Sequence, residues 1–435
     1  MKRDLRAYLD EWKNDVNRKP ILIKGARQVG KSYLTRDFGK DFKRFVEINF
    51  EFVPGLKSYF EKDLDPQRII RDLSIATGQD IIPKETLLFF DEIQECPTAI
   101  KSLRYFYEKM PQLHLIAAGS LLDFVLEEIG LPVGRVIPLY LYPLSFMEFL
   151  SAAGHERLRE EISNHNPTEE LPGFLHDKLL GLFGEYMAVG GMPEAVEKWL
   201  NTGNLKTCVK VHQMLVETYR QDFAKYAKKK NQKYVELVFN SIPRLSGKKF
   251  VFHSVSPDVR SRELRPGLEL LSKTGIAHIV YHSSANGLPL GAEINPLMSK
   301  VIFLDVALAQ SVLGMDYGKW ILDPVHYIIN RGAITEAFVG QELMAYTPAT
   351  QKSDLYYWVY EKRGSQAEVD YVTAINGNIV PIEVKSGKTG SLKSMHLFLE
   401  KKRNSPYGLQ FSQRNYHVGK EIRQYPLYAI SAALK

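Results

Sequence analysis

Short runs of apolar residues alternate with longer stretches of mixed polarity in the first third of the chain. The runs expected to form strands are Ile21–Lys24, Phe45–Asn49, Leu87–Phe90, Leu113–Ala118 and Val136–Tyr142. Their nearly continuous apolar character is typical of strands that are buried on both faces of a parallel sheet. The intervening stretches have the length of helices, so the pattern predicts a doubly wound α/β core.

The rest of the chain shows different patterns. Residues from 145 to about 200 are typical of helices and end at a Gly190-Gly191-Met192-Pro193 break. After residue 205 short helices alternate with a few strands, and from residue 331 a helix precedes three strands and further helix. We therefore expect four domains, with the limits 1–145, 146–204, 205–315 and 316–435.

Composition narrows the class of protein. The 435 residues include 57 Lys and Arg, 50 Asp and Glu and 45% hydrophobic residues, which excludes a fibrous or wholly disordered chain. The two cysteines, Cys96 and Cys208, exclude a disulfide framework and a zinc cluster. The longest apolar run contains Glu148 and prolines, and the N-terminus lacks the pattern of a secretory leader. We therefore expect a cytoplasmic protein without a membrane partner.

A glycine-rich motif follows the first expected strand. The sequence Gly25-Ala26-Arg27-Gln28-Val29-Gly30-Lys31-Ser32 fits the pattern G-x-x-x-x-G-K-[ST], and a helical stretch follows it. In such a loop the backbone N–H groups surround phosphates, and the helix N-terminus adds partial positive charge. We expect these residues to bind ATP, with Lys31 at the β- and γ-phosphates and Ser32 on Mg²⁺.

Polar residues end the later strands of the same sheet. Asp91 and Glu92 directly follow the apolar run Leu87–Phe90. This order predicts Asp91 in the Mg²⁺ shell and Glu92 as the general base that polarises the attacking water. Ser120 follows the next strand and is expected either to sense the γ-phosphate or to cap a helix.

A hairpin near the C-terminus is expected to bring two carboxylates together. Asn376-Gly377 is a strong two-residue turn signal between two strand-like segments. Such a turn pairs Ile375 with Asn378 and sets Asp370 directly opposite Glu383. Two carboxylates about 5 Å apart repel each other by about 3 kcal/mol at an effective dielectric constant of about 20. The sequence therefore predicts a cation at this pair.

The same face of the hairpin carries a lysine. Lys385 lies two residues after Glu383, so it shares the face of Asp370. Two acids and a lysine are what metal-dependent phosphodiester cleavage requires. In this interpretation Asp370 and Glu383 hold Mg²⁺ or Mn²⁺, and Lys385 helps to activate water. An exposed hairpin with ordinary surface charges is the alternative.

Several motifs together resemble one prokaryotic family. They are Gly25–Ser32, Phe89-Phe90-Asp91-Glu92-Ile93, Ala118-Gly119-Ser120, Pro143-Leu144-Ser145-Phe146-Met147-Glu148-Phe149 and Gly190-Gly191-Met192-Pro193-Glu194. Over essentially its whole length the chain is similar to AAA+ ATPases that carry a C-terminal domain of unknown function, akin to the archaeal ATPases. The resemblance implies an AAA+ core, a helical lid at 146–204 and a winged-helix-like module at 205–315.

The resemblance also suggests roles for two single residues. Pro193 either packs on the adenine, as a Gly-x-Pro does in related signalling-type ATPases, or marks a helix end. Arg135 precedes the last strand of the core. In ring-forming AAA+ proteins an arginine there reaches the nucleotide of the neighbouring subunit, which implies a homo-oligomeric ring. An ordinary surface arginine is the alternative.

The C-terminal pattern resembles a second group of proteins. Asp370 followed by Glu383-Val384-Lys385 is similar to the PD-(D/E)XK motif of restriction-endonuclease-like folds, with Val369 in place of the usual proline. The resemblance implies that a preceding helix supplies a further metal ligand, for which we choose Glu336 over Glu342. Both active nucleases and degenerate, binding-only versions of this fold exist, so both interpretations remain open.

A basic segment lies between these regions. Residues 225–249 hold eight lysines and arginines and one acid, a local charge of +7, which fits either contact with DNA phosphates or a solvated helix face. We expect an ATP-hydrolysing protein whose nuclease-like domain acts on or binds DNA, with RNA as a weaker hypothesis. The alternative is an ATP-dependent switch whose C-terminal domain binds nucleic acid or protein without cleavage.

Overall fold

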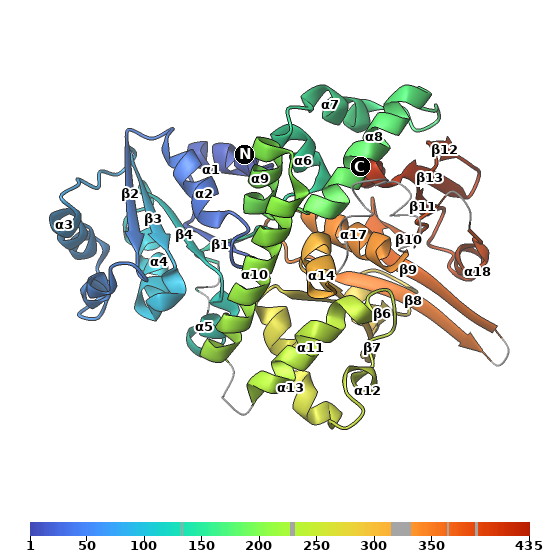
Figure 1. Ribbon diagram of the computed structural model, residues 1–435. Helices are drawn as coiled ribbons and strands as arrows, with labels where there is room; N and C mark the ends of the chain where they lie inside the picture. The colour runs from blue at the N-terminus through green and yellow to red at the C-terminus, as the bar shows by residue number, and fades with distance from the viewer. Residues whose placement is uncertain (131, 133, 227–230, 315–331, 363–364, 388–389) are drawn as a thin grey trace. The chain divides into compact units, whose positions relative to one another are not determined.

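The structure, a computed structural model, divides into two compact units. It describes all residues except 131, 133, 227–230, 315–331, 363–364 and 388–389. The N-terminal unit comprises Lys2–Tyr142 and Pro348–Lys352, and the C-terminal unit comprises Pro143–Thr347 and Ser353–Lys435 (Figure 1). We expected 146–204, 205–315 and 316–435 to be separate domains. Their described residues fall together in the C-terminal unit, apart from Pro348–Lys352. The expected limit at 315/316 lies outside the described residues.

A five-stranded parallel sheet forms the centre of the N-terminal unit, with the strand order β2-β3-β4-β1-β5. The strands are β1 (Ile21–Lys24), β2 (Arg44–Asn49), β3 (Thr86–Asp91), β4 (His114–Gly119) and β5 (Ile137–Tyr140). The central strand β1 aligns Ile21 with Ile116 of β4 and with Ile137 of β5, and all neighbours run parallel. The predicted doubly wound α/β core is confirmed.

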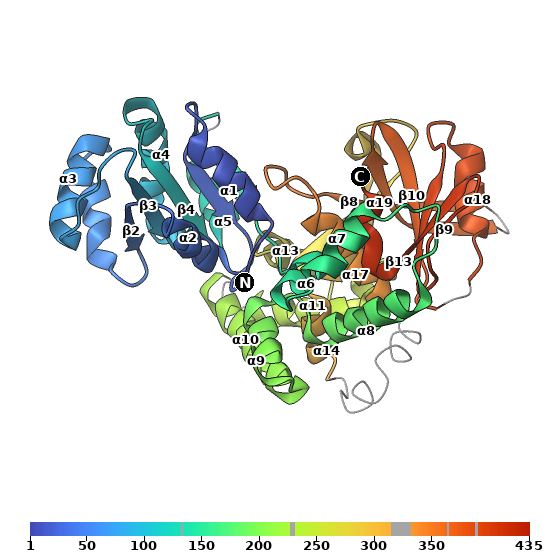
Figure 2. The ribbon, with the colours of Figure 1, turned by 90° about the horizontal axis from the view of Figure 1, so that it is seen from above.

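Helices cover both faces of this sheet (Figure 2). They are α1 (Leu5–Asn14), α2 (Lys31–Gly39), α3 (Pro66–Thr77), α4 (Pro97–Lys109) and α5 (Leu122–Ile129), with the short 3₁₀ helices η1 (Pro54–Phe60) and η2 (Ile93–Glu95). Helix α3 begins where the side chain of Asp65 accepts the N–H of Arg68 and Pro66 occupies the first turn. A capping acid followed by proline is the arrangement expected at a helix N-terminus.

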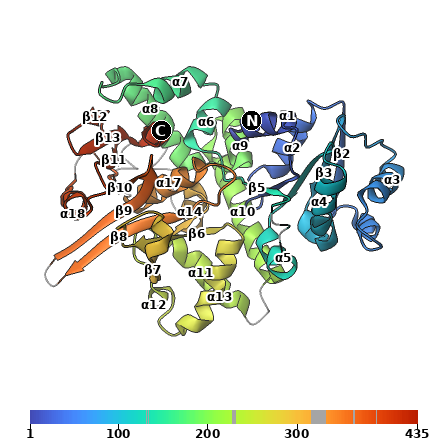
Figure 3. The ribbon, with the colours of Figure 1, turned by 180° about the vertical axis from the view of Figure 1, so that it is seen from behind.

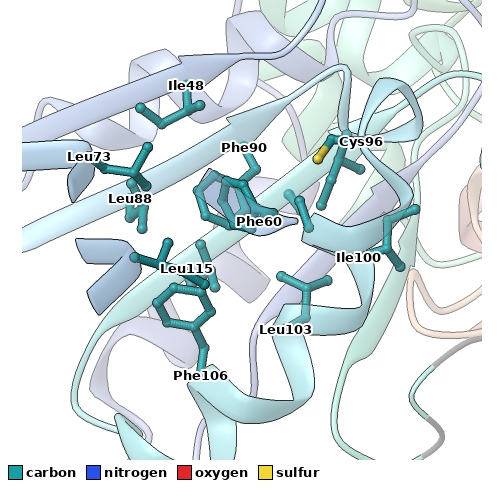
Figure 4. Packing of buried hydrophobic residues seen from close by; sticks show 14 of the residues in the cluster. Ile48, Phe60, Leu73, Leu88, Phe90, Cys96, Ile100, Leu103, Phe106 and Leu115 are labelled. Atoms are coloured by element: carbon teal, nitrogen blue, oxygen red, sulfur yellow. The ribbon is translucent and has the colours of Figure 1, made fainter. Parts of the chain in front are cut away.

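The core between the sheet and helices α3 to α5 is rich in aromatic side chains (Figure 4). Phe90 of β3 lies at its centre, with its ring centroid 5.6 Å from the rings of both Phe50 and Phe60 in edge-to-face geometry. Cys96 is buried in the same cluster as a free thiol. Interdigitated packing of this kind fixes the strand ends that carry the polar residues described below.

The C-terminal unit begins with helices and contains a second sheet. Its helices are α6 (Phe146–Ala152), α7 (Glu156–Asn164), α8 (Gly173–Val189), α9 (Pro193–Thr202), α10 (Leu205–Tyr226), α11 (Gln232–Leu245), α12 (Phe252–Val255), α13 (Ser261–Lys273), α14 (Val306–Val312), α17 (Gly332–Ala345), α18 (Lys393–Lys401) and α19 (Ile430–Ala433). Two 3₁₀ helices, η4 (Leu290–Glu293) and η5 (Leu427–Ala429), accompany them. Among the described helices, none is both long and apolar enough to span a bilayer.

The second sheet has eight strands in the order β12-β13-β11-β10-β9-β8-β6-β7 (Figure 3). They are β6 (Ala277–Ser283), β7 (Ile294–Phe303), β8 (Leu355–Lys362), β9 (Ser365–Ile375), β10 (Asn378–Val384), β11 (Gly408–Ser412), β12 (His417–Val418) and β13 (Ile422–Pro426). Strands β8, β9 and β10 are antiparallel neighbours, whereas β10 and β11 run parallel. The antiparallel pair β6–β7 joins this sheet through β8. Strands from the expected winged-helix-like segment therefore belong to the same sheet as the C-terminal hairpin.

The predicted turn between β9 and β10 is confirmed. Asn376 and Gly377 both have positive φ, +49° and +78°, as a type I′ turn requires. The paired positions run from Ile375–Asn378 to Tyr371–Ile382, which is the predicted register. Beyond them, the Oδ2 atom of Asp370 accepts the backbone N–H of Val384 at 2.7 Å. The ladder of paired residues ends one position before Asp370 and Glu383, so their direct opposition stays a prediction, and the Asp370 carboxylate turns toward β10.

A buried polar network ties the first helix of the C-terminal unit to α17. The backbone N–H of Phe146 donates to both carboxylate oxygens of Glu342, at 3.0 and 3.2 Å, and the hydroxyl of Tyr346 donates to the same carboxylate. Gln341 donates to the hydroxyl of Tyr186, which in turn donates to the carbonyl oxygen of Leu144. The Pro-Leu-Ser-Phe motif thus begins α6 while its backbone is fixed to α17.

Acid is expected to weaken the N-terminal unit through His114. This ring is buried beside α1, with Nε2 3.1 Å from the carbonyl oxygen of Lys13, and burial lowers its pKa to about 4. The unfolded chain takes up a proton near pH 6.5 that the folded unit takes up only near pH 4, so folding loses stability as pH falls between these values. Between pH 7.5 and pH 5 the free energy of unfolding should fall by about 1 to 2 kcal/mol less in His114→Phe than in the wild type.

Urea unfolding at both pH values measures this difference. The exposed His253, replaced by Phe, serves as the control and should leave the pH dependence as it is in the wild type. An equal loss of stability in the wild type and in His114→Phe would contradict the assignment.

Candidate functional sites

The glycine-rich motif forms a loop between β1 and the N-terminus of α2. Gly25 and Gly30 have φ values of +157° and +97°, and a Cβ atom at Gly25 would lie 2.2 Å from the carbonyl oxygen of Leu141. The guanidinium of Arg3 supports the loop from behind by donating to the carbonyl oxygen of Val29 at 2.8 Å. The glycines are therefore required for the backbone path and not only for flexibility.

The lysine of the motif is buried inside this loop. Lys31 is 6% exposed, and its Nζ atom donates to the carbonyl oxygens of Gly25 and Ala26 at 3.0 and 2.8 Å. Burial lowers the pKa of Lys31 to about 8, although the carboxylates of Glu92 and Asp91 oppose this shift. An ammonium group that has exchanged water for carbonyl oxygens is suited to an anion with several oxygens, such as a triphosphate.

The acidic residues after β3 lie next to the loop. The hydroxyl of Ser32 donates to Oδ1 of Asp91 at 3.0 Å, across 59 positions of sequence. Burial and the neighbouring carboxylate of Glu92 raise the pKa of Asp91 to about 6, against the effect of the Ser32 hydrogen bond. A hydroxyl and a carboxylate at a helix N-terminus are hard oxygen ligands, so Ser32 and Asp91 fit Mg²⁺.

Two further polar residues, which the sequence analysis missed, complete the site. Asn49, at the end of β2, donates to Oδ2 of Asp91 at 3.3 Å. Gln94 donates to Oε2 of Glu92 at 2.6 Å, and Glu92 itself has a left-handed backbone with φ of +49°. Asn49 could have been found from its position, because parallel strands end at the same edge of a sheet.

The remaining candidates of the N-terminal unit lie near its surface or at the next strand end. Ser120 is buried directly after β4, and Leu121 rather than Ser120 occupies the N-cap of α5. The side chain of Arg135 is 43% exposed and donates to Glu108 of α4 at 3.1 Å. Within this unit Arg135 is thus an exposed arginine with a surface ion pair.

Pro193 belongs to the C-terminal unit, where it is the first residue of α9. The preceding glycines pack tightly there, since a Cβ at Gly190 would lie 2.4 Å from Oδ1 of Asp305. The carboxylate of Asp305 also accepts the N–H of Gly191 at 2.7 Å and caps α14. At the Gly190–Pro193 break, the C-terminal end of α8 therefore packs closely against the N-terminal end of α14.

The C-terminal hairpin contributes to a cluster of buried charges. Lys300 of β7 is 1% exposed, and its Nζ atom lies 2.8 Å from Oε1 of Glu336, in contact with Glu368, and 4.0 Å from Oδ1 of Asp370. Lys385, directly after β10, pairs with Glu383 of that strand at 2.5 Å. We name these six residues the carboxylate cluster: Lys300, Glu336, Glu368, Asp370, Glu383 and Lys385.

Burial shifts the protonation of this cluster. Burial, with the charge of Asp370, raises the pKa of Glu336 to about 8 and that of Glu383 to about 7. Burial alone would lower the pKa of Lys300, yet the carboxylates of Glu336, Asp370 and Glu368 raise it above its ordinary value. Lys300 is therefore a charged ammonium group inside the cluster.

The divalent cation expected at the hairpin acids stays a prediction, and two lysines, Lys300 and Lys385, lie among these acids. Sequence analysis missed Lys300, whose only signal was a lysine beside the apolar run Val301–Leu304. The structure brings Glu336 to Asp370 but holds Glu342 at Phe146. Within the described part of the chain, no three or more His, Cys, Asp or Glu side chains are arranged to hold a metal ion. The expected ligand Glu336 instead pairs with Lys300.

The basic segment is only partly described. Lys233, Arg244, Lys248 and Lys249 are exposed on α11 and directly after it. Lys228, Lys229 and Lys230 lie outside the described residues. Contact of these exposed basic side chains with DNA phosphates stays a prediction.

Comparisons with known families agree with the nucleotide-site geometry. Residues 17–150 match the family model of an AAA domain. Residues 180–319 and 331–430 match two families described as domains of unknown function, DUF8612 and DUF4143. No curated protein matches the sequence of the chain. The chain therefore contains an AAA-type P-loop ATPase domain.

The comparison with solved structures returns archaeal and eukaryotic proteins at low similarity. A Walker-type ATPase of Pyrococcus abyssi is 17% identical, over 71% of this chain and 94% of that one, with a TM-score of 0.44. A signal-transduction ATPase with a tetratricopeptide repeat sensor from Pyrococcus horikoshii is 14% identical, over 78% of this chain and 48% of that one, with a TM-score of 0.27. The Drosophila ORC bound to DNA is 13% identical, over 72% and 85%, with a TM-score of 0.28.

Replacing Lys31 by Met tests the nucleotide site. The change removes a buried ammonium group whose hydrogen bonds go to two carbonyl oxygens and whose burial outweighs the nearby carboxylates. The unfolding midpoint of the nucleotide-free protein should therefore be unchanged or higher. Mg·ATP at about 100 times its dissociation constant should stabilise the wild type by about 2.7 kcal/mol and the variant not at all. Thermal unfolding with and without Mg·ATP measures both effects.

The matched control is Lys40→Met, at the exposed end of α2, which should keep the stabilisation by ATP. If ATP stabilises Lys31→Met as much as the wild type, Lys31 does not bind the phosphates.

Proposed function

We propose that the protein binds and hydrolyses ATP with Mg²⁺ at the P-loop and couples this reaction to a nuclease-like C-terminal domain that acts on or binds DNA. The observation that carries the ATPase part is the contact of Ser32 with Asp91, beside the buried Lys31. It joins the two halves of a Mg·ATP site that lie far apart in the sequence. We also place the protein in the cytoplasm, where its two free cysteines stay reduced.

Each residue of the nucleotide site has a distinct role in this proposal. The loop Gly25–Ser32 surrounds the phosphates with N–H groups, and Lys31 exchanges its carbonyl partners for phosphate oxygens. Ser32 and Asp91 would hold Mg²⁺, which offsets the negative charge of the phosphates. Glu92 accepts a proton from the attacking water, and Gln94 fixes the orientation of its carboxylate.

Three further assignments stay with this proposal. Ser120, at the neighbouring strand end, orients the water or senses the γ-phosphate. Arg135 leaves Glu108 and reaches the nucleotide of an adjacent subunit in a ring, since its side chain is exposed and its pairing is a surface ion pair. Pro193 contacts the adenine from the first turn of α9.

Replacing Glu92 by Gln tests the catalytic step. Gln has nearly the shape of Glu but does not accept the proton, so kcat for ATP hydrolysis should fall by about 10²–10⁴-fold while the affinity for ATP is retained. Glu95→Gln is the matched control. Glu95, at the end of η2, pairs with Lys57 of η1, so its replacement should leave kcat unchanged. Phosphate release and ATP binding are measured on the same preparations. Undiminished hydrolysis by Glu92→Gln would remove Glu92 from the mechanism.

The topology of the C-terminal unit supports a nuclease-like core. Helix α17 is followed by the antiparallel strands β8, β9 and β10, then by α18 and by β11, which is parallel to β10. This succession is similar to the PD-(D/E)XK core. Asp370 and Glu383 would hold Mg²⁺ or Mn²⁺, with Glu336 nearby and Lys385 at the attacking water. The exposed lysines and arginine of α11 would contact DNA phosphates.

One observation favours the alternative of a switch without cleavage. Lys300 already supplies a positive charge to Glu336, Glu368 and Asp370, so the cluster is partly compensated without a metal ion. In that case ATP changes the state of the protein, and the C-terminal domain only binds nucleic acid or another protein.

A cleavage assay separates the two functions. The wild type is expected to cut DNA in the presence of Mg²⁺ or Mn²⁺ and to do so faster with ATP, whereas Asp370→Asn should lose at least 100-fold in rate because a metal ligand is removed. Supercoiled, linear and single-stranded DNA and RNA are the substrates. Asp354→Asn, which changes an exposed acid, is the control.

If no substrate is cut while ATP hydrolysis is intact, the nuclease function is excluded and the switch is retained. Cutting by Asp370→Asn at the wild-type rate would place the activity elsewhere or in a contaminant.

A further inference from the structure

The carboxylate cluster contains a cation that is not part of the nuclease-like core. Lys300 belongs to β7, at the edge of the eight-stranded sheet, while the acids come from α17, β9 and β10. It is 1% exposed, and three carboxylates and the ring of Tyr357, at 5.2 Å, surround its ammonium group. A lysine is buried so completely only where opposite charges compensate for the lost water.

The charges of the cluster do not balance among themselves. Glu336, Glu368, Asp370 and Glu383 carry four negative charges when ionised, and Lys300 and Lys385 carry two positive ones. With all four acids ionised, the excess equals the charge of one divalent cation. The raised pKa values of Glu336 and Glu383 lower this excess near neutral pH when no cation is bound. In addition, Oε2 of Glu383 is buried and has no hydrogen-bond partner among the described residues, and Glu383 is only 6% exposed. A buried carboxylate oxygen without a partner is a position that a cation or a water molecule can fill.

Lys300 and a divalent cation would contact different acids of the cluster. The ammonium group contacts Glu336 and Glu368 closely, whereas it lies 4.0 Å from Asp370. Asp370 and Glu383 therefore remain for an ion, beside a positive charge that repels it. Without Lys300 the same acids would carry one more uncompensated negative charge.

We propose that Lys300 is a positioning residue that assembles the carboxylate cluster without metal and sets its affinity for a divalent cation by competing with that cation for the same carboxylates. The inference rests on the proposed metal site at Asp370 and Glu383, but not on cleavage. A domain built this way folds and keeps its acids together when no metal ion is bound. It binds Mg²⁺ or Mn²⁺ only at concentrations at which the ion competes successfully with the Lys300 ammonium group for the carboxylates.

Mn²⁺ binding by the full-length, nucleotide-free protein tests this competition. Lys300→Met keeps the length of the side chain but removes the charge, so the variant should bind Mn²⁺ at least tenfold more tightly than the wild type. Its thermal midpoint should be lower than that of the wild type without metal and should recover with Mn²⁺, while the wild type responds little. Electron paramagnetic resonance of free Mn²⁺ and thermal unfolding give the two readouts.

Three further variants make the result specific. Lys300→Arg keeps the charge and should respond to Mn²⁺ as the wild type does. Lys249→Met removes an exposed lysine of the same unit and should also behave as the wild type. Adding Asp370→Asn to Lys300→Met should abolish the tight Mn²⁺ binding, which places the ion in the cluster.

Equal Mn²⁺ affinity in the wild type and in Lys300→Met would overturn the proposal, as would a loss of stability that Mn²⁺ does not reverse. If Lys300→Met alone does not fold, the double variant Lys300→Met/Glu336→Gln restores the charge balance and should bind Mn²⁺ as the wild type does. Tighter binding by the double variant would contradict competition by charge. Because cleavage is not measured, failure of the nuclease function leaves this outcome interpretable.

Discussion

The pairing of the Lys300 ammonium group with buried carboxylates is the interaction on which the C-terminal unit depends. It joins β7, α17 and β9 at one point, so segments from three parts of the sequence meet where the charge must be compensated. An ion pair of this kind contributes less to net stability than apolar packing would, but losing one partner is costly. The ion pairs of Lys300 therefore determine how β7, β9 and α17 assemble more than they add to the free energy of unfolding.

Helix α17 connects this cluster with the start of the C-terminal unit. Glu336 on its first half contacts Lys300, and Glu342, six residues or about 9 Å further along the axis, holds the N–H of Phe146. Phe146 follows shortly after Tyr142, the last residue of the main segment of the N-terminal unit. A movement of the chain at Phe146 would act on α17 through Glu342. Glu336, one of the residues of the carboxylate cluster, lies on the same helix. In the proposed coupling of ATP to the C-terminal domain, α17 would be the element that links Phe146 to the carboxylate cluster.

The sequence predicted those features that depend on neighbouring residues. The P-loop, the strand before Asp91 and the Asn376-Gly377 turn follow from local backbone requirements, and each lies where it was expected. Lys300 could not be assigned in the same way, because its partners are set by tertiary packing. Gln94 contacts Glu92 only two residues away, but no sequence pattern singled it out. The two carboxylates of the hairpin were expected to need a cation, yet the pattern did not show that a lysine from a distant strand lies 4.0 Å from one of them, Asp370. Likewise, the common sheet of β6 to β13 arises from long-range pairing that no local signal specifies.

The central claim is that the ATP site and the C-terminal domain are energetically coupled. Coupling between two binding sites is reciprocal, so each ligand must change the affinity for the other by the same factor. The most direct measurement is the dissociation constant of ATP for the hydrolysis-deficient Glu92→Gln protein, with and without saturating DNA, beside that of DNA with and without ATP. The account predicts that both constants shift by one common factor of at least threefold. An ATP dissociation constant that is identical with and without bound DNA would contradict it.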